Sequence, residues 1–366
     1  MPPSSRLQQQ AIARLHQMAC LDSTGPHLVA PMLSELRRVV AFDSGGYFYP
    51  GDAGAPGGYV ENPDLLAVMP HYFDAHVQRS EGQVLSRRLG NFSKASTAPS
   101  ALEPGQLLTV PRDVLHRSDY YEAIMRPADL QTWVALALHA PQGRVLGKLS
   151  LFRHGGTTKL RPFAPGELAT LGLLAACLAR ALQPGELDAG DSDAQDSGLL
   201  ITTPQGRLRW TSPEAERLLP LAFGWHWRRA EASTGGLPHT LQLLVQRLQW
   251  SWQGPAGMAP PQMECRGPGG WFSLRATRMM AAADESDAVA IHITQRIPRA
   301  ARLLQALLPL ALPPRQHELA YWIASGWSES QIAARMGVGL PTVVYHRRAL
   351  YERLGTRDRQ GLLALL

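Results

Sequence analysis

The stretch Gly339–Gly355, GLPTVVYHRRALYERLG, places two tyrosines, a histidine and three arginines in one predicted helix. An arginine guanidinium stays charged and can give two hydrogen bonds to a guanine edge or to a phosphate. Tyrosine and valine suit contacts with thymine methyls and with the backbone. These residue types indicate nucleic-acid chemistry. The alternative is a basic helix whose charges only face water.

A helical projection of this stretch separates two faces. The apolar face is predicted to pack on the preceding helices and consists of Val343, Leu350 and Leu354, with His346 at its margin. The opposite face consists of Val344, Tyr345, Arg348 and Glu352, and the first three of these are predicted to read base edges. The side chains predicted to bind phosphates are Arg347, Arg353, Thr342, Arg315 and Ser328. Phosphate contacts fix position, whereas base contacts carry sequence preference.

The positive charge of the chain is concentrated at its C-terminal end. The 366 residues carry a formal net charge of +6 at pH 7. From Arg296 onward there are ten arginines and four acids, so this segment alone accounts for the excess. The preceding residues are formally neutral. A basic segment on a neutral body is the charge distribution expected of a module that binds a polyanion.

Breaker residues divide residues 312–366 into short helices. Pro314 suits the first turn of one helix, and Ser328 with Gln331 forms the capping box of the next. That second helix breaks at residues 337–339, and the arginine-rich helix starts at once. Two helices joined by a short turn containing glycine are typical of a helix-turn-helix, whose second helix enters the major groove.

This segment resembles the LuxR-type helix-turn-helix domain of bacterial transcription regulators. The matching positions are Leu312, Pro314, Arg315, Glu318, Ala324, Gly326, Ser328, Ile332, Ala333, Met336, Val338, Thr342, Val343, His346, Leu350, Leu354 and Arg359. In that family the residues after the Thr-Val pair face the bases, which implies this role for the same three side chains that the helical projection selects. The departures are Pro313 for a capping Thr, Gly339 for a capping Ser, Val344 for a frequent Lys and Arg353 for a Lys.

The rest of the chain is predicted to form two α+β domains. Residues 1–182 resemble a GAF-like sensor, through the strands QTWVALALHA and RVLGKLSLFR and the helix that starts at Pro165. Residues 183–198 are rich in acids and small residues and are predicted to be a linker. Residues 199–298 resemble a PAS-like domain, and residues 299–311 are predicted to be a coupling helix. The expected fold class is therefore multidomain α+β, with two antiparallel-sheet sensor domains before an all-α, four-helix LuxR-type domain at residues 312–366.

Both resemblances imply an antiparallel sheet that curls around a ligand cavity. Aromatic side chains of the first domain are candidates to line it, and plain core packing is the alternative for each of them. The candidates are Tyr47, Tyr49, Tyr72, Phe73, Tyr120, Tyr121 and Trp133, with Phe48 beside them.

Other classes of function find little support in the sequence. There is no nucleophile elbow, phosphate loop or kinase signature, so we expect no enzyme. The acidic positions of a phosphorylated receiver domain are missing from the N-terminal region. Three separated cysteines and unpatterned histidines indicate neither disulfides nor a metal, and no cofactor is expected. The apolar runs are short and interrupted, so we expect no membrane contact and a cytoplasmic location.

These features together predict a one-component bacterial transcription regulator that binds specific duplex DNA and is gated by a small-molecule or partner signal. RNA polymerase is a further candidate partner. A homodimer is expected from the coupling helix at residues 299–311 and from the exposed-looking leucines of the last helix, Leu362, Leu363, Leu365 and Leu366. The alternative is a sensor that acts mainly through protein partners and binds DNA only with a co-regulator.

Overall fold

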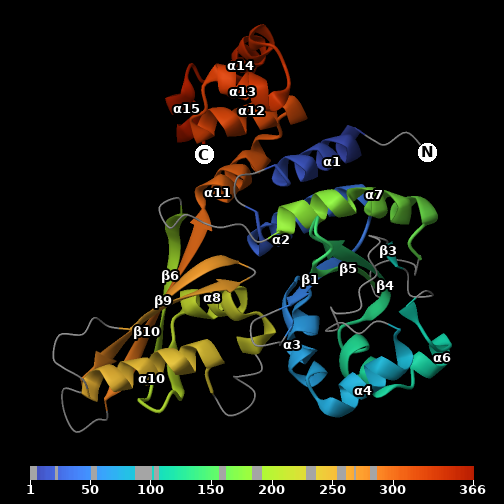
Figure 1. Cartoon of the computed structure of the whole chain (residues 1–366), viewed down its shortest axis with the longest axis vertical. Coiled ribbons are helices and arrows are strands. Elements are labelled where there is room, and N and C mark those ends of the chain that lie inside the picture. The colour runs from blue at the N-terminus through green and yellow to red at the C-terminus, as the bar shows by residue number, and fades with distance from the viewer. Residues whose placement is uncertain are drawn as a thin grey trace.

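The structure is a computed structural model of the whole chain, drawn in Figure 1. It describes residues 6–20, 24–50, 56–86, 101–102, 107–155, 162–183, 192–227, 236–253, 261–267, 269–280 and 287–366.

The N-terminal region is built on a five-stranded sheet of strand order β2-β1-β5-β4-β3, in which all neighbouring strands are antiparallel. Its strands are β1 (Ser44–Pro50), β2 (Pro56–Val60), β3 (Ala101–Leu102), β4 (Leu130–His139) and β5 (Val145–His154). Its helices are α1 (Arg6–Met18), α2 (Val29–Val39), α3 (Pro63–Tyr72), α4 (Ala75–Val84), α6 (Arg112–Leu115) and α7 (Pro165–Leu182), with short helical turns η1 (Pro26–Leu28) and η3 (Tyr121–Met125). The predicted hairpin of β4 and β5 and the helix from Pro165 are confirmed.

The two faces of this sheet pack into separate hydrophobic clusters. Side chains alternate along a strand, so Tyr47 and Phe48 of β1 point to opposite faces. Tyr47 lies in cluster A, with α1, α2 and α7. Phe48 lies in cluster B, with α3, α4 and η3.

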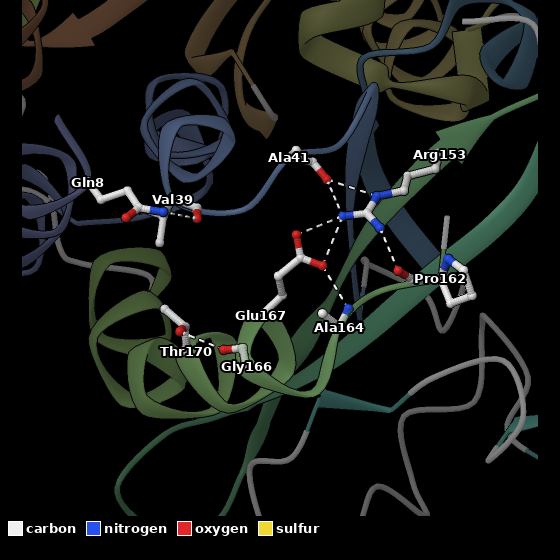
Figure 2. Close-up of polar contacts among 9 residues, drawn as sticks. All are labelled: Gln8, Val39, Ala41, Arg153, Pro162, Ala164, Gly166, Glu167 and Thr170. Atoms are coloured by element: carbon white, nitrogen blue, oxygen red, sulfur yellow. Dashed lines mark hydrogen bonds and ion pairs between the residues drawn. The ribbon is translucent and has the colours of Figure 1, made fainter. Parts of the chain in front are cut away.

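A buried arginine ties the sheet to the start of α7. As Figure 2 shows, the Arg153 guanidinium on β5 donates to the carbonyl oxygens of Ala41 and Pro162, at 2.7 and 2.9 Å, and to the Glu167 carboxylate at 3.0 Å. Glu167 in turn accepts from the backbone N–H of Ala164 at 2.7 Å, which satisfies a free donor at the N-terminus of α7. The network holds α7 against the sheet.

By length and composition alone, α7 is also the one described helix that could cross a membrane. In this structure its apolar residues, such as Leu171, Leu174 and Leu178, are buried in cluster A. Here α7 is a core helix of the first domain.

A second five-stranded antiparallel sheet has the order β7-β6-β10-β9-β8, which repeats the strand order of the first. Its strands are β6 (Ser192–Thr202), β7 (Leu208–Thr211), β8 (Gln262–Gly267), β9 (Gly270–Met279) and β10 (Ala288–Pro298). Helices α8 (Pro213–Phe223) and α10 (His239–Gln253) pack on one face and form cluster C with it.

The expected linker at residues 183–198 differs from what the structure contains. Strand β6 begins at Ser192, and its first residues pair with the end of β10, Ser192 opposite Pro298. Strand pairing uses backbone groups, so an acidic, small-residue composition does not prevent it. Residues 184–191 of this stretch lie outside the described residues.

The C-terminal part is helical, and residues 314–364 of it sit above α1 in Figure 1. It contains α11 (Arg299–Leu307), the short turn η5 (Leu308–Leu310), α12 (Pro314–Ser325), α13 (Glu329–Met336), α14 (Leu340–Leu354) and α15 (Arg359–Ala364). The helix expected over residues 299–311 therefore ends at Leu307. Leu303, Leu304 and Leu307 of α11 are buried in cluster A, which continues into α12 and α14. Helices α12 and α14 thus share one core with the N-terminal domain.

Candidate DNA-binding site

Glycines and one capping box set the boundaries of the helices at this site. Gly326 and Gly337 end α12 and α13 with φ values of 93° and 64°, a left-handed conformation that glycine adopts without strain. At the start of α13, the Ser328 hydroxyl caps the N–H of Gln331 while the Gln331 side chain accepts from the Ser328 N–H at 2.9 Å. This capping box is the predicted one, and the short turn at residues 337–339 is where the sequence placed it.

The inward face of α14 packs as the helical projection predicted. Val343 and Leu350 are buried, Leu354 is half-buried against cluster A, and His346 is half-buried at the margin. This packing fixes the rotation of α14 and therefore which side chains point away from the protein.

The three candidate base-reading residues lie on the outward side of α14. Tyr345 is 69% exposed, Arg348 is exposed and Val344 is half-buried. Among the described residues Arg348 has no ion-pair partner, so its guanidinium is available to a ligand. An exposed tyrosine and an unpaired arginine one turn apart form a surface suited to a base edge in a groove.

The five candidate phosphate residues divide into two groups. Arg353 and Thr342 are exposed on α14, and Arg353 forms no ion pair with the described residues. The other three already bind within the domain: Arg347 pairs with Glu329 of α13, Arg315 pairs with Glu318 at 3.2 Å, and Ser328 belongs to the capping box. The Arg347–Glu329 pair connects the two helices of the motif, which gives Arg347 a structural role beside the predicted one.

Three further arginines of the domain have positions that the sequence did not indicate. Arg359 donates to the carbonyl oxygens of Ile323 and Ala324, at 3.0 and 3.2 Å, and so adds a charged donor to the C-terminal end of α12. The Arg335 guanidinium lies over the ring of Trp327, 3.8 Å from its centroid. Arg357, directly after α14, is exposed without an ion pair among the described residues and joins the cationic surface. Arg357 lies in the polar loop GTRDR, where side chains are expected to face solvent, so the sequence could have indicated its exposure.

The first helix of the domain is bound to the first helix of the chain. His317 of α12 is fully buried, and its Nδ1 lies 2.7 Å from the Gln17 Oε1 of α1. Burial, assisted by the charge of Arg14, lowers the pKa of His317 to about 4, so the ring is neutral at pH 7. Arg14 itself pairs with the buried carboxylate of Glu35 at 3.0 Å. A polar contact between residues 300 positions apart leaves no local pattern in the sequence, which is why it was not predicted.

The leucines of the last helix do not support the argument for a dimer. Leu362 is fully buried, Leu363 and Leu366 are half-buried against cluster A, and Leu365 is 47% exposed. These residues close the small domain core, and the expectation that all four face outward is wrong.

The candidate ligand residues of the first domain do not surround one cavity. Tyr47 is buried in cluster A with Tyr49 half-buried against it, and the Tyr47 hydroxyl donates to the Leu146 carbonyl at 3.0 Å. The other five, Tyr72, Phe73, Tyr120, Tyr121 and Trp133, belong to cluster B or pack against it, as does Phe48. Alternation along β1 places Tyr47 and Tyr49 on one face of the sheet and Phe48 on the other.

Cluster B contains polar groups within its apolar core. The Tyr72 hydroxyl donates to the carboxylate of Glu81 at 2.8 Å, and Glu81 is completely buried. Burial, assisted by the Glu81 charge, raises the pKa of Tyr120 well above its usual value. Cluster B therefore holds a hydrogen-bonded polar pair, Tyr72 and Glu81, inside an otherwise apolar core.

A pocket lies in the second domain, away from these aromatic residues. Its volume is about 570 Å³, and it lies between the β6–β7 turn at residues 204–207 and glutamines 242, 246 and 249 of α10.

The described residues contain no group of three or more His, Cys, Asp or Glu side chains placed to hold a metal ion.

The helical part and the N-terminal part each match a known family. Residues 310–366 match the family described as bacterial regulatory proteins, luxR family, and residues 27–182 match the GAF domain. The C-terminal segment is 44% identical over 55 residues to the probable transcriptional regulatory protein SgaR of Hyphomicrobium methylovorum, a match that covers 15% of this chain and 26% of that protein.

Similarity to solved structures is weaker. Escherichia coli SdiA matches with 12% identity and a TM-score of 0.28, covering 92% of this chain and 87% of SdiA. A Vibrio cholerae VqmA–ligand–DNA complex matches with 15% identity and a TM-score of 0.25, covering 50% of this chain and 88% of VqmA. TM-scores this low do not define how the domains of this chain are arranged.

The fold and the family matches together define a sensor domain combined with a helix-turn-helix module. The C-terminal domain belongs to the luxR family of bacterial regulatory proteins, and the N-terminal domain is a GAF domain.

Proposed function

We propose that this protein is a one-component transcription regulator that binds specific duplex DNA through α14 and responds to a small-molecule or partner signal. The observation that carries the proposal is the outward surface of α14. Arg348 and Tyr345 are exposed there, and Arg348 has no ion-pair partner among the described residues. The family match supports the same role for this helix.

In this proposal Val344, Tyr345 and Arg348 read bases, and Arg353, Thr342 and Arg357 hold phosphates. The side chains of three other candidates already bind within the domain, so they must share or give up these contacts to bind a phosphate. These are Arg347, Arg315 and Ser328. The domain boundaries that we propose are a GAF domain up to residue 182, a PAS-like domain that begins with β6 at Ser192, and the luxR domain from Leu312.

Signal gating is proposed from the shared core. Helix α12 is hydrogen-bonded to α1, and α11 is buried in cluster A, so the sensor domains contact the DNA-binding helices directly. A ligand that binds one arrangement of these helices more tightly than another shifts the population toward it. A homodimer with two half-sites fits a helix-turn-helix, and sedimentation of the protein with and without DNA tests that part.

The experiment is selection of random duplex DNA by the full chain alone, followed by a salt titration on the selected sequence. We expect an enriched motif and an affinity that falls steeply with salt, since each phosphate contact releases counterions. Enrichment that appears only when a co-regulator is added would favour the alternative of a sensor that acts mainly through protein partners.

A further inference from the structure

Residues 224–227, which follow α8, connect the cores of two domains. Trp225 is fully buried in cluster B of the GAF domain, although it belongs in sequence to the second domain. Trp227, two positions on, is buried in cluster C of the second domain. The GAF domain therefore receives a large aromatic side chain from its neighbour.

The site that receives Trp225 is formed by two paired strands. Gly58 of β2 lies directly opposite Phe48 of β1, so the two positions share one face of the sheet. The Phe48 and Trp225 ring centroids are 5.7 Å apart. A Cβ on Gly58 would lie only 2.2 Å from an atom of the Trp225 ring. The missing side chain at Gly58 thus leaves the space that the indole fills.

The backbones of the two domains also approach closely beside this ring. Gly224 has φ of 56° and ψ of −138°, and a Cβ there would lie 2.7 Å from the Gly58 carbonyl oxygen. Phe73, one of the candidate ligand residues, closes the site with its ring centroid 6.4 Å from that of Trp225. We call the space bounded by Phe48, Gly58 and Phe73 the indole pocket.

The fit of Trp225 to this pocket is incomplete. Its indole Nε1 is buried and has no hydrogen-bond partner among the described residues. A buried donor without an acceptor is rare and unfavourable, and water would satisfy it if the ring left the pocket. The pocket therefore matches the shape of a planar aromatic ring better than it matches the polar edge of indole.

We propose that the indole pocket is a binding site for an uncharged planar aromatic molecule, and that Trp225 is its internal competitor. A ligand without a donor on that edge fills the same space with no unsatisfied group. When it displaces Trp225, the second domain loses an anchor on the GAF domain. The consequence for DNA rests on the proposed function: β10 ends at Pro298 where α11 begins, so a shift of the second domain reaches the DNA-binding helices.

The test uses the full chain labelled with 5-fluorotryptophan and 1-benzothiophene as the probe, because this molecule has the shape of indole without the N–H. The fluorine resonance of Trp225 is the one missing from W225F. We expect the probe to move it toward the resonances of exposed tryptophans, such as Trp210 and Trp250, which are 60% and 66% exposed. A Trp225 resonance that stays in place up to the solubility limit of the probe would overturn the proposal.

Two variants test the competition: W225A empties the pocket, and G58A fills part of it. W225A removes the competitor and should bind benzothiophene at least about tenfold more tightly than the wild type, because an occupied site lowers apparent affinity. Indole should bind W225A more weakly than benzothiophene does. Equal affinity of W225A and wild type for benzothiophene, or tighter binding of indole, contradicts the assignment.

G58A places a methyl group in the pocket and should expose Trp225 without ligand and abolish probe binding. G172A is the matched control, because a Cβ at Gly172 on α7 meets no atom within 4 Å. Probe binding that survives in G58A would place the probe elsewhere and overturn the proposal. None of these readouts involves DNA, so the pocket and the proposed DNA-binding function fail or succeed separately.

Discussion

The buried histidine between α1 and α12 should make the protein less stable in mild acid. Burial first, and the charge of Arg14 second, lower the pKa of His317 from 6.5 to about 4. The unfolded chain therefore binds a proton near pH 6.5, whereas the folded protein resists it until about pH 4. Stability is complete above pH 6.5 and falls as the pH drops toward 4, because the unfolded state then holds more protons.

The size of this effect follows from the shift in pKa. One pKa unit corresponds to about 1.4 kcal/mol, and between pH 7 and pH 5 the linkage relation gives a loss of about 2 kcal/mol for His317. Burial also lowers the pKa of His27 to about 4, so this residue adds a loss of similar size. The loss of stability between these pH values should therefore be about 2 kcal/mol smaller in H317Q than in the wild type.

The assay is urea unfolding at pH 7 and pH 5, followed by circular dichroism, with the difference between the two pH values as the readout. H292Q replaces an exposed histidine on β10 and should leave the loss at its wild-type size. If H317Q loses as much stability as the wild type, His317 is solvated, and the α1–α12 contact is open in solution.

Two further predictions concern the DNA-binding domain. R353A should weaken binding to all duplex sequences alike and reduce the slope of log affinity against log salt by about one, measured by fluorescence anisotropy; a changed sequence preference would mean that Arg353 reads bases. G326A should destabilise the chain by about 1–2 kcal/mol in thermal unfolding, because φ at Gly326 is 93°. G337A should cost less, since a Cβ at Gly326 would lie 3.1 Å from Arg359 Nη2 whereas one at Gly337 meets open space; equal losses would show that Arg359 adapts freely.

The local signals in the sequence predicted the local structure well. The capping box of Ser328 and Gln331 and the glycine turn at residues 337–339 define α13 and the start of α14, because helix termini depend on a few neighbouring residues. Helix α1 was not predicted, although Ala11, Leu15 and Met18 are spaced as one buried helical face. That spacing was the signal available for it.

The contacts between domains were not accessible from the sequence. Nothing near Trp225 indicates that its ring enters the GAF domain, and nothing near His317 points to Gln17, because such contacts depend on how whole domains dock. The separation of Tyr47 and Tyr49 from Phe48 was accessible from the sequence, since alternation along β1 predicts it. The prediction of one shared cavity rested on their aromatic side chains alone and did not use this alternation.

The central claim is that the outward face of α14 reads bases, and coupling between Arg348 and one guanine tests it most directly. The affinities of wild type and R348A are measured on the selected duplex and on duplexes in which each guanine in turn is replaced by 7-deazaguanine, which lacks the N7 acceptor. The account predicts a coupling of about 1–3 kcal/mol at one guanine in each half-site and additive effects elsewhere. Additive effects at every guanine would contradict it.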